Sequence, residues 1–244
     1  MDRGEPMKAR ISIILLFIFI YTAVLCFAFK MDRITVDALS RCFPATVVLD
    51  AGHGGEDGGA AAKDGTNEKD LNLQIAQSIA SYFDWFGIRY VSVRENDSLI
   101  GDNTLPTIRE RKVSDLRKRM QIVNETPNAI LLSIHQNYYI SEKYCGTQVF
   151  YAPKASGSSE LADCIQRDIC NALQPDNTRK IKPTEGTVFL LDKAEKTSVM
   201  VECGFLSNDT EANKLKDISY QSQLAYYMTR GLCDYINNIN TYSF

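Results

Sequence analysis

Three side chains able to bind a metal or move a proton stand at the ends of apolar runs. His53 follows residues 46–50, His135 follows residues 129–134, and Glu202 ends a third run over 198–201. The chain of 244 residues contains only these two histidines. Apolar runs bounded by glycine and polar residues indicate buried strands, and ligands of open α/β sheets gather beyond the carboxyl ends of the strands. Imidazole and carboxylate are the ligand set of a catalytic zinc, so the pattern predicts one convergent site.

A glycine-rich loop surrounds His53, with glycines at positions 52, 54, 55, 58 and 59. No Gly-Lys-Ser/Thr follows, so the loop is not of the Walker A type, and the G-x-G-x-x-G spacing of dinucleotide-binding loops is missing. We expect the glycines to let the backbone bend around His53 and to leave space for a ligand. A plain turn is the alternative interpretation.

A catalytic zinc needs a third protein ligand if its fourth position is to hold water. Five acidic residues are candidates, and composition does not choose among Asp50, Glu56, Asp57, Glu68 and Glu202. Glu68 begins a predicted helix after the glycine loop, where it would face the same cleft or simply stabilise the helix N-terminus. Glu202 borders the apolar sequence GFL, where desolvation would raise its pKa and suit a general acid or base; a buried ion pair is the alternative.

The elements that must position these residues alternate along the chain. We expect strands over 46–50, 88–93, 129–134, 146–152, 187–191 and 198–202. We expect helices from the N-cap Asn67 to Gly87, and over 108–124, 159–173 and 220–237. This alternation predicts an α/β fold, with a mostly parallel twisted sheet of about six strands and helices on both faces.

The N-terminal segment has a different composition. Residues 11–29 carry no charge over nineteen positions, which is enough for a transmembrane helix. A cleaved signal peptide is the alternative, but only Cys26-Phe27-Ala28 offers a marginal cleavage site, so we favour an uncleaved anchor. We therefore expect an anchor or signal segment over 1–30, a linker over 31–45 and a globular domain over 46–244.

Composition narrows the classes of partner and the chemistry of the cysteines. The net charge of −3 and the pI of about 5.5, with no dominant basic patch, argue against nucleic acid as a partner. Seven cysteines form no CxxC pair and are odd in number. A disulfide framework is not expected in a domain of this size, so most of the cysteines should be small core hydrophobes.

Four blocks of sequence carry a resemblance to a known family: VVLDAGHGGEDGGA, NEKDLNL, LLSIHQN and VECGFLSN. With softer similarity in RKRMQIVNETPNAILLSIHQN and GTQVFYAP, the chain from about residue 46 onward resembles the zinc-dependent N-acetylmuramoyl-L-alanine amidases of the amidase 3 type. The resemblance implies that His53, Glu68 and His135 bind Zn²⁺ and that Glu202 is the catalytic acid/base. It implies hydrolysis of the amide between N-acetylmuramic acid and L-alanine in peptidoglycan. Gln136 stands where relatives usually carry a small or apolar residue, and beside the metal it could touch substrate.

The layout of one catalytic domain over 46–244 behind an anchor, without wall-binding repeats, resembles the germination-specific amidases of spore formers. These enzymes act on cortex peptidoglycan and prepare it for muramic-δ-lactam formation. The resemblance implies an extracytoplasmic enzyme, membrane-anchored or secreted, at the developing spore envelope. Some relatives need an activating protein partner, and the basic helix 108–124 is either a docking surface for one or an ordinary solvated face.

Two other interpretations of function remain open at this point. One is another zinc hydrolase of the cell wall, a peptidase or a deacylase. The other is a non-catalytic wall-binding protein.

Overall fold

The computed structural model describes residues 13, 15–22 and 45–241. The chain divides into two compact units, Met1–Cys42 and Phe43–Phe244. In the first unit, residues 15–22 are helical and their large apolar side chains are exposed. The predicted anchor over 11–29 and linker over 31–45 lie largely outside the described residues. Within the described part of the chain, no helix is both long and apolar enough to cross a bilayer.

The second unit contains a single sheet in the part of the chain that the structure describes. Its six strands are β1 (Thr46–Ala51), β2 (Tyr90–Ser92), β3 (Ala129–Asn137), β4 (Gln148–Tyr151), β5 (Lys182–Pro183) and β6 (Ser198–Phe205). The order is β2-β1-β3-β6-β4-β5, and every neighbouring pair is parallel except β4 with β6. The predicted α/β fold with a mostly parallel six-stranded sheet is therefore confirmed.

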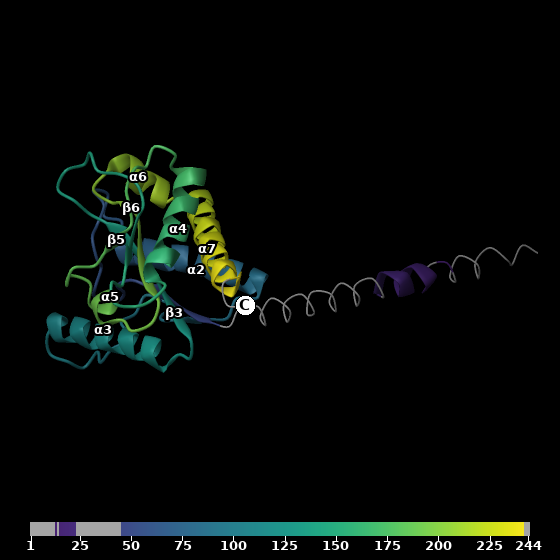
Figure 1. The fold of residues 1–244 in the computed structure, drawn as a ribbon, viewed down its shortest axis with the longest axis horizontal. Coiled ribbons are helices and arrows are strands. Elements are labelled where there is room, and N and C mark those ends of the chain that lie inside the picture. The colour runs from purple at the N-terminus through teal and green to yellow at the C-terminus, as the bar shows by residue number, and fades with distance from the viewer. Residues whose placement is uncertain (1–12, 14, 23–44, 242–244) are drawn as a thin grey trace, which may run out of the picture. The chain divides into compact units, whose positions relative to one another are not determined.

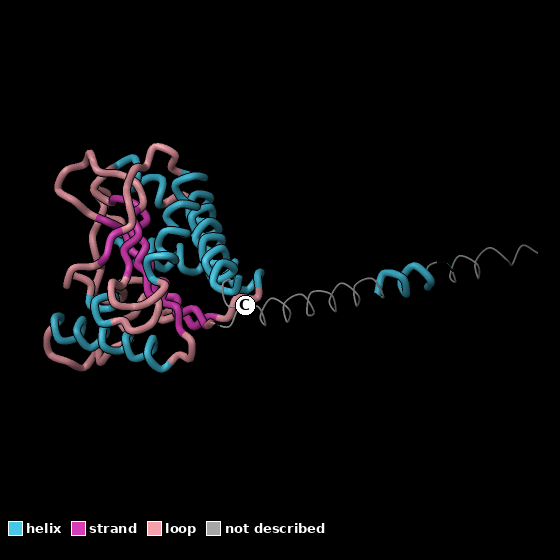
Figure 2. Tube along the Cα trace, viewed as in Figure 1, coloured by secondary structure: helices cyan, strands magenta, loops and turns pink. Residues whose placement is uncertain are grey.

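Helices cover both faces of this sheet, as Figures 1 and 2 show. One face is covered by α2 (Glu68–Phe86), α4 (Ser158–Leu173) and α7 (Ile218–Thr241). The other face is covered by α3 (Ile108–Glu125) and α5 (Phe189–Lys193). The predicted end of α2 at Gly87 is confirmed, since Gly87 has the left-handed φ of 66° that ends helices without a Cβ clash.

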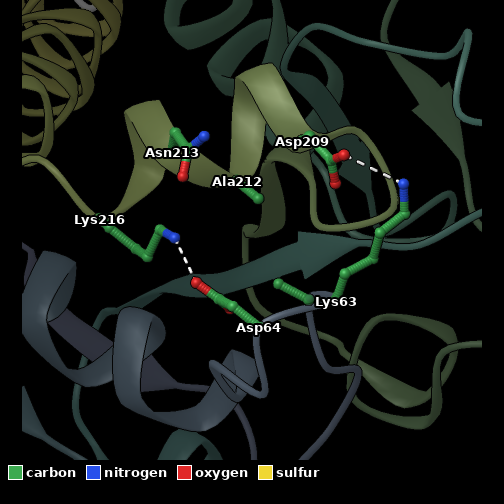
Figure 3. Close-up of a pocket in the computed structure, with 7 residues that line it drawn as sticks. Lys63, Asp64, Asp209, Ala212, Asn213 and Lys216 are labelled. Carbon is green, nitrogen blue, oxygen red and sulfur yellow. Dashed lines mark hydrogen bonds and ion pairs between the residues drawn. The ribbon is translucent and has the colours of Figure 1, made fainter.

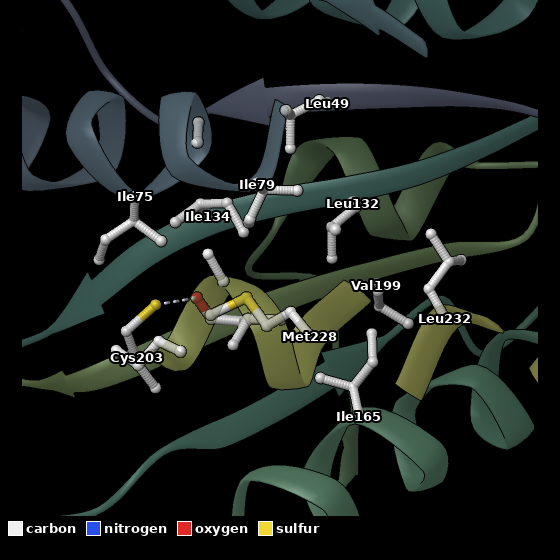
Figure 4. Close-up of a cluster of buried hydrophobic side chains, with 14 of the residues drawn as sticks. Leu49, Ile75, Ile79, Leu132, Ile134, Ile165, Val199, Cys203, Met228 and Leu232 are labelled. Carbon is white, nitrogen blue, oxygen red and sulfur yellow. Dashed lines mark hydrogen bonds between the residues drawn. The ribbon is translucent and has the colours of Figure 1, made fainter. Parts of the chain in front are cut away.

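The larger core fixes the strands that carry the candidate residues (Figure 4). Leu49, Leu132 and Val199 of the three central strands pack against helix side chains. The helices contribute Ile75 and Ile79 of α2, Ile165 of α4, and Met228 and Leu232 of α7. Burying each such side chain stabilises the fold by roughly 1.5–3 kcal/mol, so the strand ends are held on a rigid support.

The strand expected over 187–191 is wrong, because helix α5 begins within this segment at Phe189. The carboxylate of Asp192 accepts hydrogen bonds from the backbone N–H groups of Gly186 and Val188, which favours a helical turn. Leu190 and Leu191 then pack into the smaller core. A short apolar run does not distinguish a strand from a buried helix, and the sixth strand is instead the two-residue β5.

Helix α6 (Asp209–Leu215) was not expected from the sequence. Its N-cap Asn208 accepts hydrogen bonds from the backbone N–H groups of Thr210 and Glu211. The pattern of an N-cap residue with a glutamate three positions later was a visible signal of a helix start.

Candidate active site

The carboxyl ends of three neighbouring strands bring the candidate residues together. His135 of β3 is the register partner of Glu202 of β6, and β1 lies on the other side of β3. His53 comes two residues after the end of β1, and Glu68 is the first residue of α2. The site therefore lies where the chain leaves β1, β3 and β6.

His53, Glu68 and His135 form a compact group of metal-binding atoms. One ligand atom from each side chain lies within 4.8 Å of the others. Glu68 Oε1 is 3.2 Å from His53 Nε2 and 2.9 Å from His135 Nδ1, and the two imidazole rings are 5.0 Å apart. Two imidazoles and one carboxylate suit zinc, whose bonds to nitrogen and oxygen are about 2.0–2.2 Å long. The donor set and its spacing fit that ion.

Glu68 is thus the acidic candidate that joins the histidine pair, and the other four lie elsewhere. Asp50 is buried beneath the site, and Glu56 is exposed and pairs with Arg111. Asp57 contacts Nδ1 of His53, the ring nitrogen that does not face Glu68. Glu202 lies near the group but outside it.

Two of the loop glycines make room for the imidazole rings. A Cβ atom on Gly52 would lie 2.3 Å from the ring of His135. A Cβ on Gly59, whose φ of +68° also disfavours side chains, would lie 2.5 Å from Glu68 Oε2 and 2.8 Å from the ring of His53. At Gly52 and Gly59, therefore, the backbone of the loop passes against the metal-binding side chains.

His53 itself has a backbone conformation that is rare outside glycine, with φ of 61°. Asp57 Oδ2 lies 2.9 Å from Nδ1 of its ring, which leaves Nε2 facing Glu68. The guanidinium of Arg119 donates a hydrogen bond to the backbone oxygen of His53 at 2.7 Å. Burial disfavours the charged ring, but hydrogen bonds to Asp57 and Glu68 outweigh it and raise the pKa of His53 to about 9.

The same balance acts on Glu68 in the opposite direction. Glu68 is 4% exposed, and burial by itself would raise its carboxyl pKa. Hydrogen bonds and charge interactions with His135 and His53 outweigh burial and hold the pKa of Glu68 well below its usual range. The carboxylate is therefore kept ionised, as a metal ligand must be.

A buried ion-pair network supports the loop from below. Arg119 of α3 pairs with Asp50 of β1 and with Asp115, whose Oδ2 is 2.5 Å from Arg119 Nε. Ser133 of β3 donates a hydrogen bond to Asp50 at 2.6 Å. Burial would raise the pKa of Asp50, but the charge of Arg119, the hydrogen bond from Ser133 and smaller contributions of the same sign together lower it. The sequence placed Arg119 on a basic, solvated helix; the i,i+4 spacing from Asp115 was the available signal of a buried pair.

Glu202 has the opposite surroundings. Its Oε2 atom is inaccessible to solvent and has no hydrogen-bond partner among the described residues. Burial raises the pKa of Glu202 to about 7, with the charge of Glu68 acting in the same direction and the two histidines against it. A carboxyl with a pKa near neutrality is able to accept and return a proton.

Gln136 does not face the site opening, contrary to the expectation that it could touch substrate. Its side chain is 3% exposed and donates a hydrogen bond to Asn72 Oδ1 of α2 at 3.1 Å. Successive side chains of a strand point to opposite faces, so the residue after His135 turns away from it. The backbone N–H of Gln136 does contribute, because it donates to Glu68 Oε1 at 3.1 Å.

Ion pairs join the segment that follows the glycine-rich loop to α6, across a cleft of about 370 Å³ (Figure 3). Lys63 lies 3.0 Å from Asp209, and Lys216 pairs with Asp64. Lys63 also pairs with Glu142, in the loop that follows β3. Segments following β1, β3 and β6 are thus linked at the surface.

Comparison with known proteins gives matches over nearly the whole second unit. The family described as N-acetylmuramoyl-L-alanine amidase, Amidase_3, matches residues 47–234. A germination-specific N-acetylmuramoyl-L-alanine amidase of Bacillus subtilis is 33% identical over 189 residues, which are 78% of this chain and 78% of that protein.

Two solved structures are also similar. The CwlD amidase from Clostridioides difficile, in complex with the GerS lipoprotein, is 35% identical with a TM-score of 0.76, over 79% of this chain and 98% of that one. An N-acetylmuramoyl-L-alanine amidase from Clostridium difficile 630 is 30% identical with a TM-score of 0.69, over 79% of this chain and 97% of that one.

Proposed function

Since this chain belongs to the N-acetylmuramoyl-L-alanine amidase family Amidase_3, we propose that it hydrolyses peptidoglycan with a zinc ion held by His53, Glu68 and His135. The observation that carries the proposal is the meeting of three ligand atoms within 4.8 Å. Glu202 lies near this group, and its Oε2 has no hydrogen-bond partner among the described residues; it is proposed as the catalytic acid/base. The proposed catalytic domain spans 46–244.

The proposed roles follow from the surroundings of each side chain. When bound, zinc supplies Lewis acidity, which lowers the pKa of water to roughly 7 and polarises a carbonyl. Asp57 orients the ring of His53 so that Nε2 faces the site. Glu202 takes a proton from the attacking water and delivers one to the amine that leaves when the muramoyl–alanine amide breaks.

The competing functions have less support. A wall-binding protein without activity would have no need for a buried carboxyl near a complete set of metal-binding side chains. A peptidase or deacylase would use the same chemistry, so the product decides: an amidase releases intact stem peptides with a new L-alanine amino terminus.

Two variants test the roles in the site. We expect His135→Ala to lose zinc and activity together, and Glu202→Ala to keep zinc while losing turnover. Zinc content and released peptide are measured on both, with Arg109→Ala on the exposed face of α3 as control. Full zinc occupancy in His135→Ala, or retained turnover in Glu202→Ala, would remove that residue from the proposal.

We further propose that the substrate is spore-cortex peptidoglycan on its way to muramic-δ-lactam. Support comes from the 33% identity to a germination-specific amidase. A strain lacking the protein should make cortex with little muramic-δ-lactam, measured by separating the muropeptides; unchanged cortex would contradict this role.

We also propose a location and a partner for the protein, from its family and from a similar amidase. An enzyme of this class meets its substrate outside the cytoplasm, delivered by the predicted anchor or signal segment over 1–30. A similar amidase binds a lipoprotein, which supports a protein partner here. Arg111 and Lys112 of α3 already pair with Glu56 and Asp57, so part of the basic helix is occupied by this chain.

A further inference from the structure

A second cavity, of about 670 Å³, is lined by Arg179 and Glu211, which both contact Phe205 at the end of strand β6. Its walls come from residues 143–146, 173–179 and 208–220. Three of its lining side chains are cationic: Lys143, Arg179 and Lys214. None of them has a part in the mechanism described above.

These cations differ from those of the cleft in Figure 3. In that cleft Lys63 is paired with Asp209 and Lys216 with Asp64. In the larger cavity, no ion pair among the described residues includes any of the three cations. Positive charge without a carboxylate partner is available for an anionic ligand.

The carboxylates that line the larger cavity do not occupy its cations. Glu211 directs both oxygens elsewhere: Oε1 accepts the backbone N–H of Gly146 at 2.9 Å, and Oε2 accepts that of Phe205 at 2.8 Å. Asp176, the other lining carboxylate, is exposed and forms no ion pair among the described residues. The cavity therefore holds more positive than negative charge.

Arg179 is held in place before any ligand arrives. Its Nε donates to the backbone oxygen of Cys145 at 2.8 Å, and its Nη1 donates to Gln148 Oε1 at 2.9 Å. The guanidinium carbon lies 4.5 Å from the centre of the Phe205 ring and 5.7 Å from that of Tyr144. Its Nη2 makes no hydrogen bond within the described residues. A fixed planar guanidinium with free donors recognises carboxylates well.

Gln148 connects this arginine to the catalytic region. Gln148 of β4 is the register partner of Glu202 on β6, and such cross-strand side chains share a face with Cβ atoms about 5 Å apart. With Arg179 bonded to the end of the Gln148 side chain, the guanidinium lies on the order of 10 Å from Glu202. A peptide spans that distance in about three residues.

We propose that this cavity binds a carboxylate of the peptidoglycan stem peptide, with Arg179 as the specificity-determining contact and Lys143 and Lys214 in support. The proposal rests on the proposed function, in which the scissile amide joins the sugar to the first residue of that peptide. The carboxylates of the following residues then come within reach of Arg179. Amidating those groups removes the charge that the cavity recognises.

Matched substrates test this site. Two muropeptides are compared, one with free carboxylates on its stem peptide and one with the same groups as carboxamides. We expect Arg179→Gln to raise KM for the acidic substrate about tenfold, with kcat unchanged, and to leave KM for the amidated substrate as it was. A purely structural role for Arg179 would affect both substrates equally, and that result would overturn the proposal.

Two lysines near the end of α6 provide a matched pair of variants. We expect Lys214→Gln to raise KM for the acidic substrate by about threefold, because a flexible ammonium contributes less than a fixed guanidinium. Lys216→Gln removes the same charge two residues away, from a lysine already paired with Asp64, and should leave KM unchanged. Equal effects of the two variants would contradict a ligand site in this cavity.

Binding without turnover separates this proposal from the proposed function. Calorimetry measures the affinity of the acidic stem tripeptide for the wild-type chain and for Arg179→Gln. Weaker binding to the variant supports the site whether or not the chain is an active amidase, and equal binding overturns it. A wild-type chain that hydrolyses neither muropeptide would instead remove the proposed function.

Discussion

The two sides of the candidate site treat their ionisable groups in opposite ways. On the side of His53 and Glu68, each side chain has charged or hydrogen-bonding partners, and a buried Asp50–Arg119 pair supports the loop beneath. On the side of Glu202, the carboxyl oxygen Oε2 is inaccessible to solvent and has no hydrogen-bond partner in the part of the chain that the structure describes. The pKa of Glu68 is therefore lowered, whereas burial raises that of Glu202 to about 7.

The difference shows how one sheet edge can hold two carboxyl groups for two tasks. A metal ligand has to remain ionised, which partners ensure. A proton carrier has to change its protonation state near neutral pH, which isolation from partners allows. Two carboxyl groups at the same end of the sheet, Glu68 of α2 and Glu202 of β6, thus differ in chemistry because their contacts differ.

The largest expected effect comes from breaking the support on the paired side. Arg119→Met would leave Asp50 and Asp115 buried without their cation, which should lower the free energy of unfolding by about 3–5 kcal/mol. Urea unfolding measures it. Arg117→Met, on the exposed face of the same helix, should change stability by less than about 0.5 kcal/mol. Equal stability of the two variants would show that the network adds nothing.

Glu202→Gln tests how the isolated carboxyl of Glu202 affects stability at different pH. Because the folded-state pKa of about 7 lies above the unfolded value, Glu202 supports folding fully below about pH 4.5, and this contribution is lost as the pH rises through 7. The metal-free variant should therefore be more stable than the metal-free wild type at pH 8, by up to roughly 3 kcal/mol. Near pH 4 the two should be alike. Thermal unfolding across this range checks the prediction, and a pH-independent difference would contradict it.

Asp57→Asn weakens the paired side without touching the metal-binding atoms. The variant keeps the shape of Asp57 but loses its charge beside His53 Nδ1. Zinc affinity should fall by about 10–100-fold, measured by competition with a chelator. Glu56→Gln is the control, since Glu56 pairs with Arg111 and does not contact His53. The same loss in both variants would point to a general effect of loop charge.

The smallest effect on stability is expected from the exposed ion pairs of Lys63. Lys63→Ala removes the contacts to Asp209 and Glu142, yet solvent and salt screen such pairs strongly. Unfolding of the variant and the wild type should differ by little more than the error of measurement, and by nothing in about 0.5 M salt. A large difference that persists in high salt would mean that the ion pairs of Lys63 contribute stability that we assign to the buried network.

The sequence was informative where one pattern had one structural meaning. Alternating strands and helices gave the fold class, and the two histidines at strand ends gave the location of the site. Gln136 could have been placed too, since the two-residue period of a strand turns it away from His135. The glycine loop was expected to leave space for a ligand, and at Gly52 and Gly59 the neighbouring space is filled by side chains of the site itself.

The remaining features depended on tertiary contacts. Arg119 lies in a basic segment that suits a solvated helix, and its burial depends on Asp50, 69 residues away, as well as on Asp115 of the same helix. The apolar run over 187–191 is compatible with strand and helix alike, and the carboxylate of Asp192 decides between them. Glu68 was chosen among the five acidic candidates from the family resemblance. Composition does not say which acidic residue lies close to the two histidines.

The reversed direction of β4 places one connection at the end of the sheet that carries the candidate site. Since β4 runs against β6, residues 138–147 both leave β3 and enter β4 at the edge where Glu202 lies. A longer or shorter connection would change the access to Glu202, whereas the hydrogen-bonded strand pairs of the sheet would stay the same. A change in the length of this one connection can thus alter the surroundings of Glu202 without changing the strand pairs beneath it.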